Sequence, residues 1–259
     1  MRNAFVLAAV AFVVLVALAA CGGGDKRPGA DELFGDAVGG DYVSLGDSIA
    51  AGAGSSDGAG YDQVLFGELV GRVGRTAVLH HRARGGATTQ DLIDEQLSGT
   101  LDTLRGSGGR LITITIGGSD LDILQTSVDA ATCVADVDDP KCPVAEILIG
   151  TEGRLDRILG DLREAAPNVP IVIQVYPNLF SGTGHAFEQA ADQAFGRLND
   201  VIERVAARHD VLVADPRAAF EGRGGELTHT LDATPDFHPN DAGYEVIADA
   251  FIEVLGLGD

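Results

Sequence analysis

Short runs of β-branched and aliphatic residues alternate with longer stretches of helical period along most of this chain, and no other feature limits its fold as much. A few residues after each run comes Gly, Asp or Pro, where a strand gives way to a loop. The alternation is typical of a parallel sheet whose two faces are both covered by helices. We expect five strands, at residues 42–45, 77–81, 111–116, 171–176 and 211–214.

Between the later strands, apolar residues recur every three or four positions, which predicts amphipathic helices packed on the sheet. We interpret three such stripes as core: Leu148, Leu155, Ile158, Leu159 and Leu162; Phe187, Ala191, Phe195, Leu198, Ile202 and Val205; and Tyr244, Ile247, Ala248, Phe251 and Val254. Asn240 is expected to cap the third helix, with Asp241 in its first turn. The functional crevice of such a sheet lies beyond the carboxyl ends of its strands, so residues directly after the strands are the first candidates for chemistry.

The first twenty residues are typical of a targeting signal. Arg2 provides a positive start, and residues 4–20 contain no charged side chain, a length that suits a secretory signal and is short for a membrane span. The run ends in Leu-Ala-Ala-Cys, which resembles the bacterial lipobox, whose cysteine is lipidated and becomes the new N-terminus. We therefore expect a signal peptide at residues 1–20 and a lipid anchor at Cys21. An uncleaved membrane anchor is the alternative, and both place the remaining chain on the extracytoplasmic side of a bacterial cell membrane.

Domain organisation follows from the next change in composition. Residues 22–40 carry seven glycines and Pro28 without apolar periodicity, so we expect a flexible, lipid-anchored tether over residues 21–40. The remainder, residues 41–259, has the length of one α/β domain and leaves little room for a second. A periplasmic solute-binding protein, which needs two lobes, is therefore disfavoured, and we expect a monomer.

The charge balance is strongly acidic, with 39 Asp and Glu against 18 Lys and Arg and a formal net charge of −21. Such a surface repels nucleic-acid phosphates and anionic lipid headgroups unless a basic patch intervenes, and the sequence has no Lys/Arg cluster. A phosphate-binding Gly-x-x-x-x-Gly-Lys loop and metal-ligand spacings of His, Asp and Glu are also absent from the sequence. We therefore expect no nucleic-acid partner and no cofactor.

Cys133 and Cys142 are the two thiols that remain when Cys21 is lipidated. They flank a polar segment that contains Pro140, and export would bring them to a compartment where disulfides persist. We expect a local disulfide between them. A zinc site is the alternative, but no neighbouring histidine or second cysteine pair is present to complete it.

The first predicted strand runs directly into Gly46, Asp47 and Ser48, a tight turn with a hydroxyl at its apex. This turn presents Ser48 toward the predicted crevice. The tripeptide alone is not specific, because Gly, Asp and Ser are also the ordinary residues of turns and helix caps.

A second candidate lies near the other end of the chain, where His238 is followed by Pro239 and the predicted cap Asn240. A rigid proline after the ring and a helix cap after that would hold the imidazole in one orientation, as a general base requires. The other histidines lack this frame: His80 and His81 lie in a predicted strand, His209 closes a helix, and His185 and His229 lie in loops.

Taken together, these segments resemble those of the Gly-Asp-Ser-Leu (GDSL) esterases and lipases of the SGNH hydrolase superfamily, and the resemblance extends from Tyr42 to the C-terminus. The fold that we expect is a flavodoxin-like three-layer α/β/α sandwich with a five-stranded parallel sheet. The resemblance implies that Ser48 is the nucleophile and His238 its base. It also implies an oxyanion hole formed by the backbone N–H groups of Ser48 and Gly86, the latter in an Arg-Gly-Gly-Ala segment after the second strand.

Two of the four blocks that carry the family's catalytic groups depart from its pattern. Members show Gly-x-Asn-Asp after the central strand, whereas this chain has Gly-Gly-Ser-Asp, so that Ser119 replaces the asparagine as the expected oxyanion residue. Loss of one such donor costs about 10²- to 10³-fold in turnover. The family's Asp stands three residues before the histidine, where this chain has Pro235. We expect Asp236 to orient His238 instead, with Asp232 or a backbone carbonyl as alternatives.

The resemblance therefore implies a GDSL/SGNH-type esterase or lipase that hydrolyses a carboxylic ester through an acyl-enzyme. A lipid, a short-chain ester and an acetylated glycan are all permitted as substrates. Residues 121–144 and 177–187 are expected to form the walls of the binding site. Because two blocks are altered, a different class also stays open: a catalytically weak or inactive lipoprotein that keeps the fold and binds glycans or lipids.

Overall fold

A computed structural model describes residues 39–73, 77–107, 109–121, 133, 135–136, 139, 141–234 and 236–258. The predicted signal peptide, the predicted lipidation site Cys21 and nearly all of the predicted tether lie outside these residues. Within them, no helix combines the length and the hydropathy that crossing a bilayer requires.

The centre of the fold is a sheet of five parallel strands in the order β2-β1-β3-β4-β5. The strands are β1 (Gly40–Gly46), β2 (Ala77–His81), β3 (Gly109–Thr115), β4 (Ile171–Gln174) and β5 (Leu212–Ala214). This order is the flavodoxin-like one. The predicted fold class is therefore confirmed, and each of the five expected strands is present.

One predicted strand ends two residues early, and a side chain explains why. The backbone N–H of Tyr176 donates to Oδ1 of Asn199 at 2.8 Å, and Nδ2 of Asn199 donates to the Tyr176 carbonyl at 2.8 Å. The buried amide of Asn199 thus takes the place of a neighbouring strand. The chain leaves the sheet at this point and turns toward the carboxyl edge.

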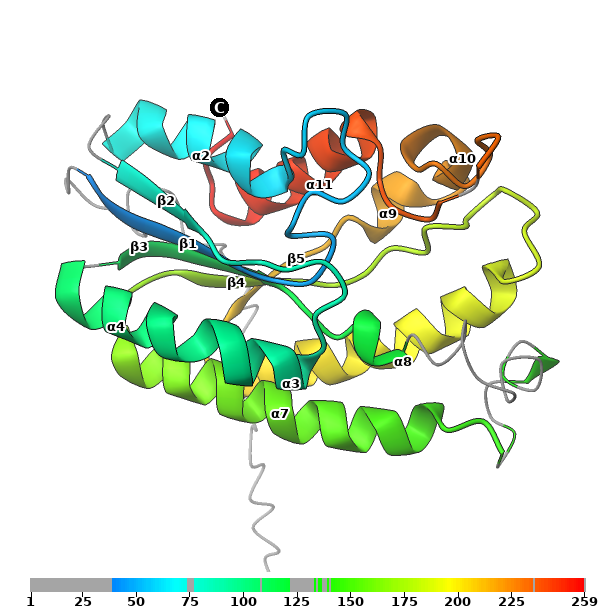
Figure 1. Cartoon of the computed structure of the whole chain (residues 1–259), viewed down its shortest axis with the longest axis horizontal. Coiled ribbons are helices and arrows are strands. Elements are labelled where there is room, and N and C mark those ends of the chain that lie inside the picture. The colour runs from blue at the N-terminus through cyan, green and yellow to red at the C-terminus, as the bar shows by residue number, and fades with distance from the viewer. Residues whose placement is uncertain are drawn as a thin grey trace, which may run out of the picture.

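Helices cover both faces of the sheet (Figure 1). One face carries α2 (Tyr61–Val73) and α11 (Asp241–Val254), together with the short helices α9 (Arg217–Phe220) and α10 (Gly224–Leu227). The other face carries α7 (Val144–Ala165), α8 (Glu188–Arg208) and a composite helix in which α3 (Thr89–Asp91) continues through a π-helical segment, η1 (Leu92–Leu97), into α4 (Ser98–Ser107). A single 3₁₀ turn, η2 (Ser119–Leu121), follows β3.

The core lies between the sheet and these helices, because strands buried on both faces leave no polar side of the sheet. The predicted stripes of α7 and α11 are buried along their full length, and Asn240 caps α11 by accepting from the backbone N–H of Gly243. The stripe predicted for α8 belongs only partly to the core. Phe187 and Phe195 are only half-buried and border a cavity, so the start of this stripe belongs to the functional region.

A disulfide joins Cys133 and Cys142, whose Cα atoms lie 5.0 Å apart. Both cysteines are buried, and the second directly precedes Pro143 at the start of α7. The cross-link therefore joins two cysteines nine positions apart next to the N-terminal end of this long helix.

Candidate active site

A cavity of about 470 Å³ brings together four of the residues predicted from sequence: Ser48, Gly86, Ser119 and His238. These residues come from the loops after β1, β2 and β3 and from the loop before α11. The carboxyl ends of parallel strands meet at one edge of the sheet, which is where ligands of this fold class bind. The structure thus assembles the predicted site from segments that are far apart in the sequence.

The turn that carries Ser48 is fixed by Gly46. Its φ of +134° is available to glycine, and a Cβ atom at this position would lie only 2.0 Å from the Thr115 carbonyl oxygen on β3. Both backbone groups of Gly46 are bound by the buried side chain of Gln96, at 2.8 Å each. Gln96 lies in the π-helical segment η1, a geometry often found at functional sites.

The buried side chain of Asp47 also stabilises this turn. Its Oδ1 accepts from the Ile49 backbone N–H at 3.0 Å and from the Thr115 hydroxyl at 3.4 Å, and the Tyr176 hydroxyl donates to its Oδ2. Burial raises the pKa of Asp47 to about 7, although these hydrogen bonds act in the opposite direction. A carboxyl group that titrates near neutral pH therefore lies next to Ser48.

His238 is oriented by Asp236. Nδ1 of the ring lies 2.7 Å from Oδ1 of Asp236, and the same oxygen accepts from the His238 backbone N–H at 3.1 Å. Partial burial alone would raise the pKa of Asp236, but the bonds and charge of His238 hold it below its ordinary value. Of the two carboxylates considered from sequence, Asp232 contacts a different ring, that of His229.

The serine and the imidazole border the same cavity without a direct hydrogen bond between them among the described residues. Such bonds are often long in unliganded sites and shorten when substrate binds. Because Nδ1 is paired with Asp236, Nε2 is the ring nitrogen left for the serine.

The loops that carry Gly86 and Ser119 are joined through the buried side chain of Asp120. Oδ2 of Asp120 accepts from the Thr89 backbone N–H at 2.8 Å, and Oδ1 accepts from the Thr89 hydroxyl at 2.6 Å and from Arg154 at 2.9 Å. This network links the segments after β2 and β3, and so fixes the two predicted oxyanion positions relative to each other.

The walls of the cavity are mostly apolar and rich in aromatic rings. They comprise Ile49, Ala53, Leu121, Leu179, Phe180, Phe187, Ala190, Ala191, Phe195 and Phe237. Phe237 packs against the ring of His238, with centroids 4.5 Å apart, and against Phe180 at 6.3 Å. Leu121 and the residues from Leu179 to Phe187 belong to the two stretches that were expected to form walls, and several residues between 122 and 140 lie outside the described part of the chain.

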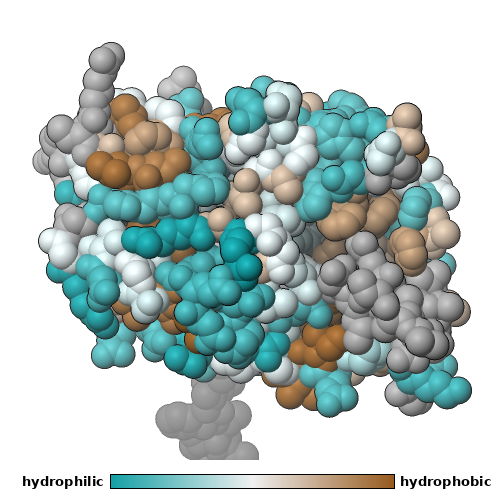
Figure 2. Space-filling model, in the orientation of Figure 1, coloured by the Kyte–Doolittle hydropathy of each residue, from teal (hydrophilic) through white to brown (hydrophobic). Residues whose placement is uncertain are grey.

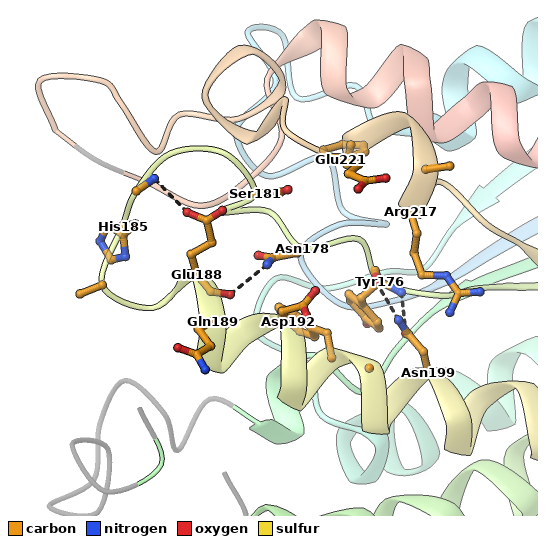
Figure 3. Close-up of a pocket in the computed structure, with 16 residues that line it drawn as sticks. Tyr176, Asn178, Ser181, His185, Glu188, Gln189, Asp192, Asn199, Arg217 and Glu221 are labelled. Carbon is orange, nitrogen blue, oxygen red and sulfur yellow. Dashed lines mark hydrogen bonds between the residues drawn. The ribbon is translucent and has the colours of Figure 1, made fainter. Parts of the chain in front are cut away.

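A second cleft, of about 890 Å³, is larger but polar (Figure 3). Glu188 and Asn178 in this cleft are already hydrogen-bonded: Glu188 accepts from the backbone N–H groups of Gly182 and Gly184, and Asn178 donates to the Glu188 carbonyl. The cleft shares only Tyr176 and Phe195, whose rings stack at 5.5 Å, with the apolar cavity. Neither Ser48 nor His238 lines it, so the smaller cavity is the candidate active site.

Sequence reasoning missed several residues that support this site, among them Gln96, Tyr176 and His229. Tyr176 is the last residue of a predicted strand, and its position at the carboxyl edge was a usable signal. Gln96 and His229 carried no such signal, since their partners Gly46 and Gly54 lie 50 and 175 positions away.

Comparison with known proteins gives one family. The model of the GDSL-like Lipase/Acylhydrolase family matches residues 44–246. Lipase 1 of Streptomyces coelicolor is 28% identical over 226 residues, which cover 78% of this chain and 81% of that protein. A lipase of Streptomyces rimosus is 26% identical over 227 residues, 78% of this chain and 82% of that protein.

Solved structures show the same fold at lower sequence identity. The lipase Lip_vut3 from a goat rumen metagenome superposes with a TM-score of 0.65 at 20% identity, covering 83% of this chain and 96% of that chain. The acetylxylan esterase Axe2 from Geobacillus stearothermophilus superposes with a TM-score of 0.60 at 19% identity, covering 85% of this chain and 96% of that chain.

Proposed function

Because the chain belongs to the GDSL-like lipase/acylhydrolase family, we propose that it hydrolyses carboxylic esters through an acyl-enzyme formed on Ser48. Ester hydrolysis itself follows from the family and from its lipase and esterase relatives. The mechanism is inferred from the site. The observation that carries it is the convergence of Ser48, Gly86, Ser119 and His238 on one cavity, with Asp236 paired to the imidazole.

In the first step, Nε2 of His238 takes the proton of the Ser48 hydroxyl, and Oγ attacks the ester carbonyl. The negative charge that develops on the carbonyl oxygen is stabilised by the backbone N–H groups of Ser48 and Gly86, with Ser119 beside them. The imidazolium then protonates the leaving alcohol, and water releases the acid in a second, equivalent step. Asp236 keeps the Nδ1 proton in place and stabilises the imidazolium.

The proposed substrate is an ester with an apolar acyl group. The cavity beside Ser48 is lined mainly by aliphatic and aromatic side chains, which bind apolar groups by excluding water. At about 30 Å³ per water, its 470 Å³ corresponds to roughly fifteen water molecules, far more space than an acetyl group fills. An acyl chain of several carbons matches this volume better than the acetyl group of a glycan.

Labelling with a fluorophosphonate probe tests the nucleophile, because the reaction requires an activated serine. We expect the wild-type protein to be labelled and to hydrolyse p-nitrophenyl esters with a preference for medium acyl chains. Ser48→Ala should lose the label and at least 10³-fold of the activity. Labelling of a different residue would overturn the assignment. If neither protein were labelled although the wild type bound lipids or glycans, the chain would be a non-catalytic binding lipoprotein.

The proposed place of action is outside the cytoplasm, on a lipid anchor. The uncharged run of residues 4–20 and the lipobox-like ending at Cys21 support this proposal. The seven glycines of residues 22–40 would then separate the catalytic domain from the bilayer.

A further inference from the structure

We propose that His229 is a positioning residue of this reaction. Its ring, protonated on both nitrogens, joins the loop after β1 that carries Ser48 (the loop of the nucleophile) to the loop before α11 that carries His238 (the loop of the base). Nδ1 of His229 lies 2.6 Å from Oδ2 of Asp232, and Nε2 lies 2.8 Å from the carbonyl oxygen of Gly54. The inference rests on the proposed roles of Ser48 and His238. It concerns the contacts that hold these two residues in position relative to each other.

The protonation state follows from the partners. A carboxylate and a backbone carbonyl both only accept hydrogen bonds, so each ring nitrogen must carry a hydrogen to satisfy them. The bond to Asp232 raises the pKa of His229, and the bond to the Gly54 carbonyl adds to this effect. The carboxylates that act on the ring are those of Asp232 and Asp236 on its own loop and of Asp241 at the start of α11.

The backbone of His229 belongs to the loop of the base. Its N–H donates to the carbonyl of His238 at 3.2 Å, and its own carbonyl accepts from the N–H groups of Asp232 and Asp236 at 3.1 Å each. Residue 229 is thus bound directly to the base and to the carboxylate that orients it. The backbone of residue 229 thus holds the base and its carboxylate within one hydrogen-bonded loop.

On the other side, the ring reaches the loop of the nucleophile. Gly54, which accepts from Nε2, adjoins Ala53, and the Ala53 N–H donates to the Ser48 carbonyl at 3.0 Å. The loops touch without space for a side chain: a Cβ atom on Gly54, whose φ is +90°, would lie 2.9 Å from Cβ of His238. Two hydrogen bonds therefore connect His229 with the nucleophile: that of its ring with Gly54, and that of the adjoining Ala53 with Ser48.

Two side chains of α11, the helix that follows the loop of the base, also bind the loop of the nucleophile. The Tyr244 hydroxyl donates to the Ala53 carbonyl at 2.7 Å, and Oδ1 of Asp241 accepts from the Ser56 N–H at 2.8 Å. Burial raises the pKa of Tyr244, whereas the bonds from Ser56 lower that of Asp241. Near neutral pH the Tyr244 hydroxyl stays protonated and the Asp241 carboxylate stays ionised. Of the three side chains that bind this loop, only His229 therefore changes its protonation state with pH.

The sign of the pH effect follows from the raised pKa. Below it the ring carries both hydrogens, and both bonds are present. Above it one nitrogen loses its hydrogen, and either the Asp232 or the Gly54 contact becomes a repulsion between two acceptors. We expect turnover to fall at that point, because a displacement of about 1 Å between reacting groups costs up to 10²-fold. KM should stay nearly constant, since apolar walls bind the acyl group.

The test compares His229→Ala with His229→Gln in the full chain. The alanine variant should lose about 10- to 100-fold in kcat with KM within about twofold. Glutamine offers one amide donor to Gly54 and does not titrate. His229→Gln should therefore recover part of kcat and lack the fall in kcat with rising pH that we expect of the wild type. Active-site titration with a fluorophosphonate counts the folded sites in each sample.

His209→Ala is the matched control, because His209 forms a similar pair with Asp156, at 3.0 Å, at the distant end of α8. Its kcat and pH profile should equal those of the wild type. A wild-type kcat and an unchanged pH profile in His229→Ala would overturn the inference, as would a lowered melting temperature as its only effect. If Ser48→Ala were inactive while His229→Ala stayed normal, the proposed function would stand and only the role of His229 would fail.

Discussion

Ser119 borders the catalytic cavity at the position where the family resemblance places an asparagine. A serine hydroxyl is shorter than a carboxamide, and it rotates, so it is a weaker and less fixed donor to an oxyanion. The neighbouring Asp120 network is intact and holds the backbone of this turn in place. Backbone geometry and side-chain chemistry can therefore be separated by substitution.

Replacing Ser119 with asparagine should raise kcat about 10-fold or more with little change in KM, because a preorganised donor acts on the transition state. Steady-state kinetics on one p-nitrophenyl ester measures this directly. Ser119→Ala is the control and should lie close to the wild type if the hydroxyl contributes little. A decrease in kcat of Ser119→Asn in a protein that is folded and labelled would show that serine suits this loop better.

Asp47 should make the stability of the fold depend on pH. Its folded pKa, raised to about 7, means that the native state binds a proton more tightly than the unfolded chain does, so stability falls as pH rises from the unfolded pKa to about 7. Asp47→Asn should remove this effect. Its free energy of unfolding, taken relative to that of the wild type, should therefore rise by about 3 kcal/mol between pH 5 and pH 8. Urea unfolding at both pH values measures the difference. Asp102→Asn, at a side chain that is 82% exposed, is the control and should keep the pH dependence of the wild type.

At the scale of helices and strands, Arg163 connects helix α7 to two loops that lead into the sheet. Near the C-terminal end of α7, its guanidinium donates to the carbonyls of Val169 at 2.9 Å, His209 at 3.1 Å and Asp210 at 2.6 Å. His209 is the C-cap of α8, and since the last carbonyls of a helix have no partner within the helix, a basic side chain is one way to satisfy them. One residue thus joins the end of α7 to the loops before β4 and β5.

Removal of these donors should destabilise the domain without touching the chemistry. Arg163→Met keeps the length of the side chain and leaves several carbonyls unpaired, at a cost of about 1–3 kcal/mol in the free energy of unfolding. Arg157→Met is the control, since Arg157 is 62% exposed and makes one ion pair with Asp161 at 3.7 Å. Denaturant unfolding should separate the two variants. Equal stabilities would mean that water replaces Arg163 at no cost.

The inner strands β1, β3 and β4 could be predicted well from sequence, because they are buried along most of their length and consist mainly of apolar and β-branched residues. Their ends could not, because side chains from other elements set them, as Asn199 does for β4. The same distinction applies to the site. Ser48, His238 and the neighbouring Asp236 could be proposed from local motifs, whereas the pairing of Asp232 with His229 depends on how one loop folds back on itself.

At the scale of the whole molecule, the surface agrees with the charge balance. The face in Figure 2 is mostly hydrophilic, with hydrophobic residues confined to a few patches. With a net charge of −21, attachment to an anionic bilayer is opposed by electrostatics. The proposed membrane location therefore depends on the lipid at Cys21 and not on the surface of the domain.

Metabolic labelling with an alkyne fatty acid tests that dependence in cells. The wild-type protein should incorporate the label and begin at Cys21, because acylation and cleavage occur at the same residue. Cys21→Ser should incorporate none. An unlabelled wild-type protein that retains residues 1–20 would instead support an uncleaved membrane anchor.

Ser48 follows β1 and His238 precedes α11, so the two side chains to which we assign the reaction are synthesised in sequence, one early and one very late. A nascent or truncated polypeptide that stops before residue 238 possesses the hydroxyl but has nothing to activate it. With the proposed roles of these residues, ester hydrolysis requires that the C-terminal segment has docked. We therefore expect no hydrolysis from a chain that is still being synthesised.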